Sequence, residues 1–171
     1  MKLPLLVVHS APNSTAAESP RVHSGASGAS RAVSFDCPPA LNGTRVLAVD
    51  DDPDARNLLA IVLEQCGAEV RTCGSAAEAL AVLDEYRPDV LVSDIGMPDE
   101  DGYAFIRQVR AREVPGRPRM PAVALTAYAR VEDRLKALSA GYNMHVPKPV
   151  EPTELAVVIA SLVPKSGGPG N

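Results

Sequence analysis

The sequence lacks the features that mark several common classes of protein. It contains no tryptophan, only 4% aromatic residues and no excess of positive charge, since its formal net charge is −4. No apolar run approaches the roughly 20 residues that a helix needs to span a bilayer. We therefore expect a cytoplasmic chain that makes no direct contact with a membrane and binds no nucleic acid itself.

Cysteine is also scarce. The chain has three cysteines, an odd count, and their spacing is not that of a metal site. Cys66 and Cys73 lie in apolar-patterned segments, so we expect them to be small core residues rather than halves of a bridge. The apolar run at residues 3–8 is shorter than the ~7–15 residues of a signal peptide and contains Pro4, which argues against a secretory signal.

Composition divides the chain into segments. Residues 9–43 are rich in Ser, Ala, Pro and Gly and show no periodic apolar pattern, which predicts a flexible linker. Residues 164–171 have the same character and are predicted to be a disordered tail. Between these segments, residues 44–163 alternate regularly between strand and helix signals, so we expect one domain there.

The predicted domain contains five β/α units. Short apolar runs predict strands at 45–49, 69–73, 89–93, 121–125 and 144–146. Amphipathic patterns predict helices at 53–66, 75–86, 102–112 and 130–140, and a last helix that carries Leu155 to Leu162. Strict alternation predicts a parallel sheet with helices on both faces. We expect an α/β, flavodoxin-like doubly wound (βα)5 fold with strand order 2-1-3-4-5 and a site at the carboxyl ends of the strands.

The first helix shows the local signals. Asp52 is a plausible N-cap, and Pro53 suits the first helical position. Apolar residues follow at helical spacing, and the pattern predicts that the following face the core: Ala55, Leu58, Leu59, Val62 and Cys66. Gly67 is expected to end the helix.

Polar side chains follow the predicted strands at the points where these end. Asp50 and Asp51 come after the first strand, Asp94 after the third, Thr126 after the fourth and Lys148 after the fifth. The carboxyl ends of parallel strands meet at one rim, so we expect these groups to converge. Three carboxylates at close range repel one another, and Mg²⁺ would relieve this repulsion while leaving positions for phosphate oxygens.

This arrangement predicts phosphoryl transfer. Asp94 would be a carboxylate nucleophile that forms an aspartyl phosphate. Asp50 and Asp51 would hold Mg²⁺ against the phosphoryl oxygens. Lys148 would supply a positive charge to a second oxygen, and Thr126 would donate a hydrogen bond to a third.

These residues also carry a family resemblance. In order and spacing, the sequence resembles the receiver domain of response regulators over residues 44–163. The motifs that carry it are Val49-Asp50-Asp51-Asp52-Pro53, Ser93-Asp94-Ile95-Gly96-Met97-Pro98 with Asp101-Gly102, Leu125-Thr126-Ala127 and Pro147-Lys148-Pro149.

The resemblance implies a role for each matching position. Asp94 would be the phosphoacceptor, and Mg²⁺ would be held by Asp50, Asp51, Asp94 and the backbone carbonyl of Gly96. Ala127 would leave space beside the phosphoryl group. The resemblance further implies that the Lys148–Pro149 peptide bond is cis.

The resemblance also implies a switch. Thr126 would swing toward the phosphoryl group, and His145 occupies the rotating position that is more often Tyr or Phe. His145 is equally compatible with a half-buried histidine of an edge strand. The expected output surface comprises residues 130–140, residues 144–146 and the last helix, through which a phosphorylation-dependent dimer could also form.

The expected partner is a histidine kinase or a histidine phosphotransfer protein. Met1–Leu5 resembles the final strand of a histidine-kinase ATP-binding domain, so residues 1–8 are interpreted as a possible remnant of one. We therefore predict the C-terminal receiver of a hybrid histidine kinase, whose parent protein would be a kinase that could be membrane-anchored. The alternative is a stand-alone single-domain response regulator.

A different class of protein has to be weighed against a receiver. An Mg²⁺-dependent phosphohydrolase with an Asp nucleophile would use similar groups. Such a hydrolase would need a second acid two residues beyond the nucleophile, where Gly96 stands. We expect a receiver that catalyses its own phosphorylation and dephosphorylation rather than a multiple-turnover enzyme.

Overall fold

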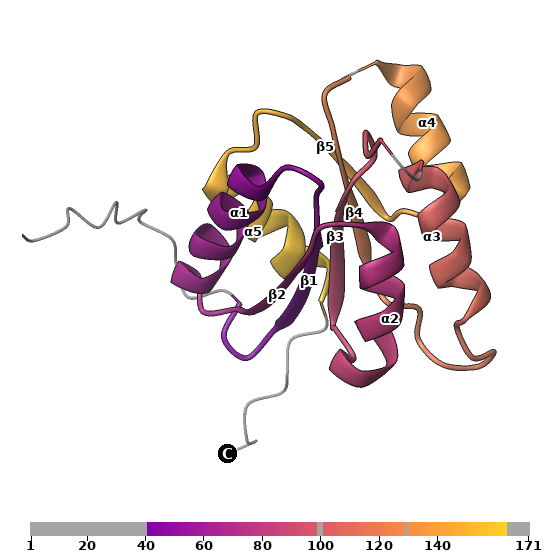
Figure 1. The fold of residues 1–171 in the computed structure, drawn as a ribbon, viewed down its shortest axis with the longest axis horizontal. Helices are drawn as coiled ribbons and strands as arrows, with labels where there is room; N and C mark the ends of the chain where they lie inside the picture. Colours follow the sequence, from indigo (N-terminus) through magenta and orange to yellow (C-terminus); the bar gives the residue numbers. More distant parts are fainter. Residues whose placement is uncertain (1–40, 99–100, 129, 164–171) are drawn as a thin grey trace, which may run out of the picture. The chain divides into compact units, whose positions relative to one another are not determined.

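A five-stranded parallel sheet forms the centre of the domain (Figure 1). The computed structural model describes residues 41–98, 101–128 and 130–163. The strands follow the order β2-β1-β3-β4-β5, as predicted. They are β1 (Arg45–Val49), β2 (Glu69–Cys73), β3 (Val90–Asp94), β4 (Ala122–Thr126) and β5 (Met144–Pro147).

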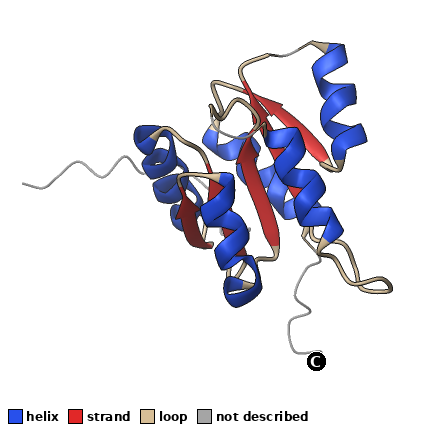
Figure 2. Ribbon diagram, turned by 45° about the vertical axis from the view of Figure 1, so that its right-hand side comes forward, coloured by secondary structure: helices blue, strands red, loops and turns tan. Residues whose placement is uncertain are grey.

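Helices cover both faces of this sheet (Figure 2). They are α1 (Pro53–Gln65), α2 (Ala76–Tyr86), α3 (Gly102–Ala111), α4 (Val131–Ala140) and α5 (Pro152–Leu162). One apolar cluster joins α1 and α5 to the sheet, and a second joins α2, α3 and α4 to it. These two clusters are the two halves of a doubly wound core, which confirms the predicted flavodoxin-like fold.

The inner strands are buried more completely than the edge strand β2. Every residue of β3 and β4 is buried, whereas β2, at one edge of the sheet, buries only Cys73. This agrees with the continuous apolar runs of the central strands and the more polar run of β2. β3 and β4 begin and end one residue later than predicted, because parallel pairing continues through Asp94, which lies opposite Leu125. Asp94 and Thr126 are therefore the last residues of their strands.

Helix α1 begins as its sequence predicts. The Asp52 side chain accepts a hydrogen bond from the Asp54 amide at 2.9 Å, and Pro53 is the first helical residue. The buried face differs from the prediction at one position: Leu58 is 54% exposed. Leu63 is fully buried instead, because the stripe that starts at Leu59 continues through it.

One expectation about the start of the core needs correction. The predicted linker 9–43 ends too late, because Leu41 is fully buried and its amide donates to the Cys66 carbonyl at 3.1 Å. A single leucine outside a periodic pattern gives no signal of burial. The rest of that segment, with residues 1–8 and 164–171, lies outside the described residues.

The cysteine prediction is partly wrong. Cys66 and Cys73 are both buried, as expected, and Cys73 is a free thiol. Cys66, however, is disulfide-bonded. Periodicity reports that a position is buried but not whether its sulfur is oxidised.

Within the described ranges, no helix combines the length and the apolar character needed to cross a membrane.

Candidate functional site

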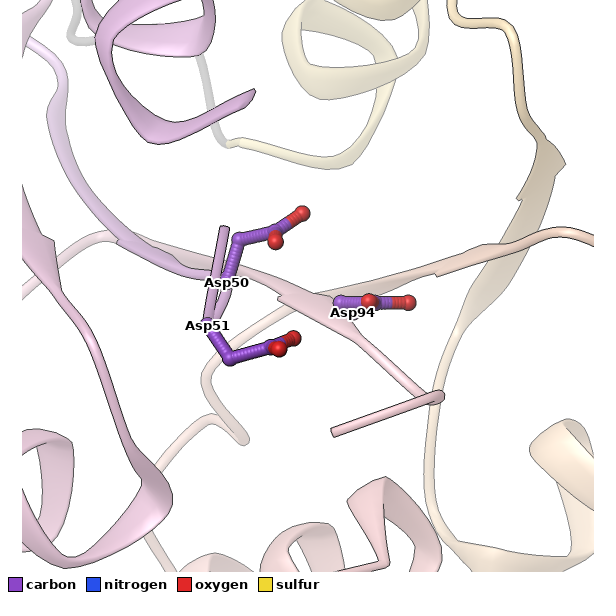
Figure 3. Close-up of side chains that lie close together, drawn as sticks. All are labelled: Asp50, Asp51 and Asp94. Carbon is purple, nitrogen blue, oxygen red and sulfur yellow. The ribbon is translucent and has the colours of Figure 1, made fainter. Parts of the chain in front are cut away.

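Three carboxylates converge at the carboxyl ends of β1 and β3 (Figure 3). Asp50, Asp51 and Asp94 each offer an oxygen, and these oxygens lie within 4.8 Å of one another. Asp50 is fully buried and Asp94 nearly so, whereas Asp51 is exposed to solvent. Charges this close and this poorly hydrated repel one another strongly, so the cluster needs a positive partner.

Backbone hydrogen bonds hold the two buried carboxylates in place. Oδ1 of Asp50 accepts from the Asp52 amide at 3.0 Å, and Oδ1 of Asp94 accepts from the Gly96 amide at 3.0 Å. The Asp50 amide in turn donates to the Cys73 carbonyl at 3.2 Å. The tight turns after β1 and β3 therefore bind one oxygen of each acid and leave the other directed into the site.

Lys148 places a positive charge beside the two buried carboxylates. Its Nζ lies 2.8 Å from Oδ2 of Asp50 and 3.1 Å from Oδ2 of Asp94. Burial lowers the pKa of this ammonium, but hydrogen bonds to Asp50 and Asp94 and their charges raise it above its ordinary value. Lys148 therefore stays charged. Its amide donates to the Thr126 carbonyl at 2.7 Å, and the Lys148–Pro149 bond is cis, as predicted.

Thr126 lies at the same rim but its hydroxyl is engaged elsewhere. The side chain is buried, and Oγ1 accepts from the Tyr128 amide at 3.1 Å and donates to the Tyr128 carbonyl at 3.3 Å. The hydroxyl thus stabilises the turn after β4 and makes no hydrogen bond to Asp94. Ala127, between the two, is exposed to solvent.

His145 lies on β5 opposite Ala124 of β4. It is half-buried, and its Nε2 is buried without a hydrogen-bond partner among the described residues. Gly96 is exposed, and its carbonyl accepts no hydrogen bond from any described residue. A Cβ at Gly96 would lie 3.7 Å from Oδ1 of Asp94, so the position is close to the acidic cluster.

The donor set fits a hard divalent cation. Asp50, Asp51 and Asp94 offer carboxylate oxygens, and the Gly96 carbonyl is an additional oxygen without a partner in the described structure. Mg²⁺ takes a few carboxylates and keeps several waters, whereas zinc sites normally include sulfur or imidazole. One ammonium cannot balance three carboxylates, so the cluster favours such an ion.

Sequence patterns missed one residue that shapes this cluster. Nη1 of Arg56, in the first turns of α1, donates to the backbone carbonyl of Asp50 at 2.7 Å and to that of Asp51 at 2.9 Å. Arg56 therefore fixes the segment that carries both acids. A single arginine on a helix gives no signal of this role, because its partners are backbone atoms.

Comparison with known proteins places this site in a family. Residues 46–160 match the response regulator receiver domain family. An uncharacterized 14.6 kDa protein of Leptolyngbya boryana is 51% identical over 110 residues, which are 64% of this chain and 82% of that protein. The virulence transcriptional regulatory protein PhoP of Shigella flexneri is 34% identical over 124 residues, which are 72% of this chain and 54% of PhoP. The chain thus spans about half the length of PhoP.

Solved structures agree with this assignment. Chemotaxis protein CheY4 of Vibrio cholerae superposes with a TM-score of 0.66 at 30% identity, over 71% of this chain and 99% of CheY4. A putative response regulator from Chloroflexus aurantiacus gives a TM-score of 0.65 at 33% identity, over 71% of this chain and 98% of that one. The chain belongs to the response regulator receiver domain family, and its described part is a receiver domain of two-component signalling.

Proposed function

We propose that this receiver domain takes a phosphoryl group from a phosphohistidine onto Asp94 in an Mg²⁺-dependent reaction. The observation that carries the proposal is the meeting of Asp94, two further acids and the Lys148 ammonium at one rim of the sheet. Phosphoryl transfer needs positioning and electrostatic stabilisation more than covalent chemistry, and this rim supplies both.

The chain's own residues account for most of the steps. A carboxylate oxygen of Asp94 forms a bond to phosphorus while the bond from phosphorus to the imidazole nitrogen of the donor breaks, and that nitrogen keeps the electron pair. Lys148 is already 3.1 Å from Asp94 and would follow the charge onto the phosphoryl oxygens. When bound, Mg²⁺ supplies positive charge at the transferred group. Asp50 and Asp51, with the Gly96 carbonyl, would hold it.

A surface for the donor adjoins the site. A groove of about 280 Å³ runs beside Asp50 and Lys148 and is otherwise mostly apolar. Its apolar lining comprises Ala55, Leu58, Leu59, Val62, Leu125, Pro149, Val150, Pro152 and Leu155. A donor must bring its phosphohistidine to Asp94, so its contact surface has to lie at this rim. Leu58, 54% exposed, is therefore proposed as a contact for the histidine kinase or phosphotransfer protein.

Two variants on one helix test this docking surface. Leu58→Ser should slow transfer from a phosphorylated histidine phosphotransfer domain but leave labelling by acetyl phosphate unchanged, because the small donor needs no groove. Ile61→Ser is the matched control, since Ile61 is 51% exposed on α1 but does not line the groove. Equal transfer to Leu58→Ser and to the parent would refute the docking surface.

Intact mass tests the central proposal. With acetyl phosphate and Mg²⁺, the parent should gain one stable phosphoryl group, Asp94→Ala none, and Asp52→Ala one, because Asp52 only caps α1. A phosphohydrolase would instead turn over many equivalents without stable labelling. Label retained on Asp94→Ala would refute the assignment.

The wider context stays a prediction. Placement as the C-terminal receiver of a hybrid histidine kinase rests on Met1–Leu5, outside the described residues, with a stand-alone regulator as the alternative. The genomic reading frame upstream of Met1 would distinguish them. A phosphorylation-dependent dimer through α4, β5 and α5 also stays a prediction, supported by the exposed Val131, Leu135 and Leu138 of α4.

A further inference from the structure

A buried tyrosine connects two parts of the domain that are distant in sequence. Tyr142 follows the end of α4, and its amide donates to the Ala137 carbonyl in the last turns of that helix at 3.1 Å. Its side chain is buried, and its hydroxyl donates to the Gly102 carbonyl at 2.9 Å, across 40 residues of sequence. Gly102 is the first residue of α3. Tyr142 thus ties the end of α4 to the beginning of α3.

The same hydroxyl lies beside the residue that precedes the phosphoacceptor. The Ser93 hydroxyl donates to the Asp94 carbonyl at 3.0 Å. Burial raises the pKa of the Tyr142 phenol well above its ordinary value, although Ser93 opposes the rise. The phenol therefore stays protonated and keeps its role as a donor.

Gly102 is packed tightly against the phosphoacceptor strand. Its amide donates to the Ile95 carbonyl at 3.2 Å, and a Cβ at this position would come within 2.6 Å of the Ile95 Cα and 2.8 Å of the Asp94 carbonyl oxygen. A shift of Gly102 would therefore push directly on the backbone of Asp94 and Ile95. A hydrogen bond that holds Gly102 in place therefore also holds the end of β3 in place.

We propose that Tyr142 is a positioning residue for the chemistry at Asp94, acting through the hydrogen bond from its hydroxyl to the Gly102 carbonyl. Gly102 packs against the backbone of Asp94 and Ile95, and Ser93, which directly precedes Asp94, donates to the Asp94 carbonyl. These contacts hold the Asp94 backbone and carboxylate, and the Gly96 carbonyl, in the arrangement suited to a cation and a phosphoryl group. The Tyr142 amide is also hydrogen-bonded to α4. Tyr142 therefore connects the site to the surface of α4 and β5 by a route that differs from the predicted movement of Thr126 and His145. This inference rests on the proposed function.

Tyr142→Phe isolates the hydroxyl, because it keeps the buried ring and removes only the side-chain hydrogen bond to the Gly102 carbonyl. Tyr103→Phe is the matched control: Tyr103 lies next to Gly102 on α3, but its hydroxyl makes no hydrogen bond within the part of the chain that the structure describes. Ser93→Ala removes the neighbouring hydroxyl while leaving Tyr142 in place, and provides a second variant should Tyr142→Phe fold poorly.

Two readouts separate positioning from mere stability, both taken far below the melting temperature of each variant. The first is Mg²⁺ affinity, from a titration followed by amide NMR shifts. The second is the rate of labelling by acetyl phosphate. Tyr142→Phe should weaken the affinity and slow the labelling by about two- to tenfold, the effect of one ordinary hydrogen bond, and Tyr103→Phe should change neither. Ser93→Ala should act in the same direction as Tyr142→Phe.

A separate NMR measurement tests the link between Tyr142 and α4. In the parent, the phosphoryl mimic beryllofluoride should shift the amide signals of Gly141–Asn143, and Tyr142→Phe should reduce these shifts. A parent that is never labelled would overturn the proposed function and this inference with it. A parent that is labelled normally, with Mg²⁺ affinity and labelling rate unchanged in both Tyr142→Phe and Ser93→Ala, would overturn the positioning role alone.

Discussion

The Lys148 ammonium lies 2.8 Å from the Asp50 carboxylate, although 98 residues separate the two in the sequence. The same ammonium lies 3.1 Å from Asp94. One positive charge is thus shared between the proposed metal-binding acid and the proposed phosphoacceptor, while Asp51 has no ion-pair partner among the described residues. The fold therefore brings together an acidic cluster that is only partly neutralised.

This imbalance predicts that Mg²⁺ stabilises the fold. A cation that binds only the native state raises the free energy of unfolding by about 1.4 kcal/mol at ten times its Kd, which corresponds to a few degrees in Tm. Thermal melts with and without Mg²⁺ measure this shift. Asp51→Asn should reduce this Mg²⁺-dependent shift. Asp52→Asn should leave the shift unchanged, because the Asp52 side chain caps α1 and asparagine can keep that cap. No Mg²⁺-dependent shift in a sample that still accepts phosphate would contradict the metal site.

Arg56 provides a prediction about the backbone of the acidic pair. Arg56→Ala leaves the carbonyls of Asp50 and Asp51 without their donor, so we expect a loss of about 1–3 kcal/mol in unfolding free energy and weaker Mg²⁺ binding. Arg107→Ala is the control, because Arg107 is exposed on α3 and surface changes are usually within about 0.5 kcal/mol. Urea denaturation measures the unfolding free energy of both variants. A smaller loss for Arg56→Ala than for Arg107→Ala would show that these hydrogen bonds contribute nothing.

The sequence predicts the fold more completely than the fine structure of the site. Apolar runs and helical periodicity locate the five strands, and the strand order follows from the doubly wound topology that strict alternation of strands and helices predicts. The convergence of Asp50, Asp51, Asp94 and Lys148 also follows from where strands end. Leu41 could not be placed in the same way, because its burial depends on a contact with the end of α1 rather than on a periodic pattern.

The residues that support the site show a second limit of prediction from the sequence. Arg56 and Tyr142 both act on backbone carbonyls, those of Asp50, Asp51 and Gly102. Every residue has a carbonyl, so nothing in the sequence marks which one a distant side chain will reach. The roles of Thr126 and His145 remain predictions, because their movement requires a second state.

Cys73 predicts how stability depends on pH. Burial, and secondarily the charge of Glu78, raises the pKa of its thiol from its ordinary value of 9.0 to about 11. The unfolded chain therefore loses this proton first, so the contribution to stability is complete below pH 9 and falls as the pH rises toward about 11. Urea denaturation across this range measures the slope. Cys73→Ala should flatten it between pH 9 and 11, and an identical slope in parent and variant would contradict the assignment.

Thr126→Ala tests how phosphorylation would be transmitted. In the structure the Thr126 hydroxyl is bonded to Tyr128, while the buried Nε2 of His145 on the neighbouring strand has no partner among the described residues. A phosphoryl group brings about −1.5 to −2 charge and strong acceptor oxygens, which would compete for that hydroxyl and draw it toward Asp94. Movement of Thr126 would vacate space beside β5, into which His145 could turn.

The energies are of the right size for such a switch. Moving a two-state equilibrium from 1:99 to 99:1 takes about 5.5 kcal/mol, and charge-assisted hydrogen bonds contribute about 1.5–3 kcal/mol each. We expect Thr126→Ala to keep labelling but lose the amide NMR shifts that beryllofluoride causes across residues 130–163, whereas Thr126→Ser, which keeps the hydroxyl, should retain them. A full response in Thr126→Ala would show that the signal leaves the site by another route, for which the hydroxyl of Tyr142 is the structural candidate.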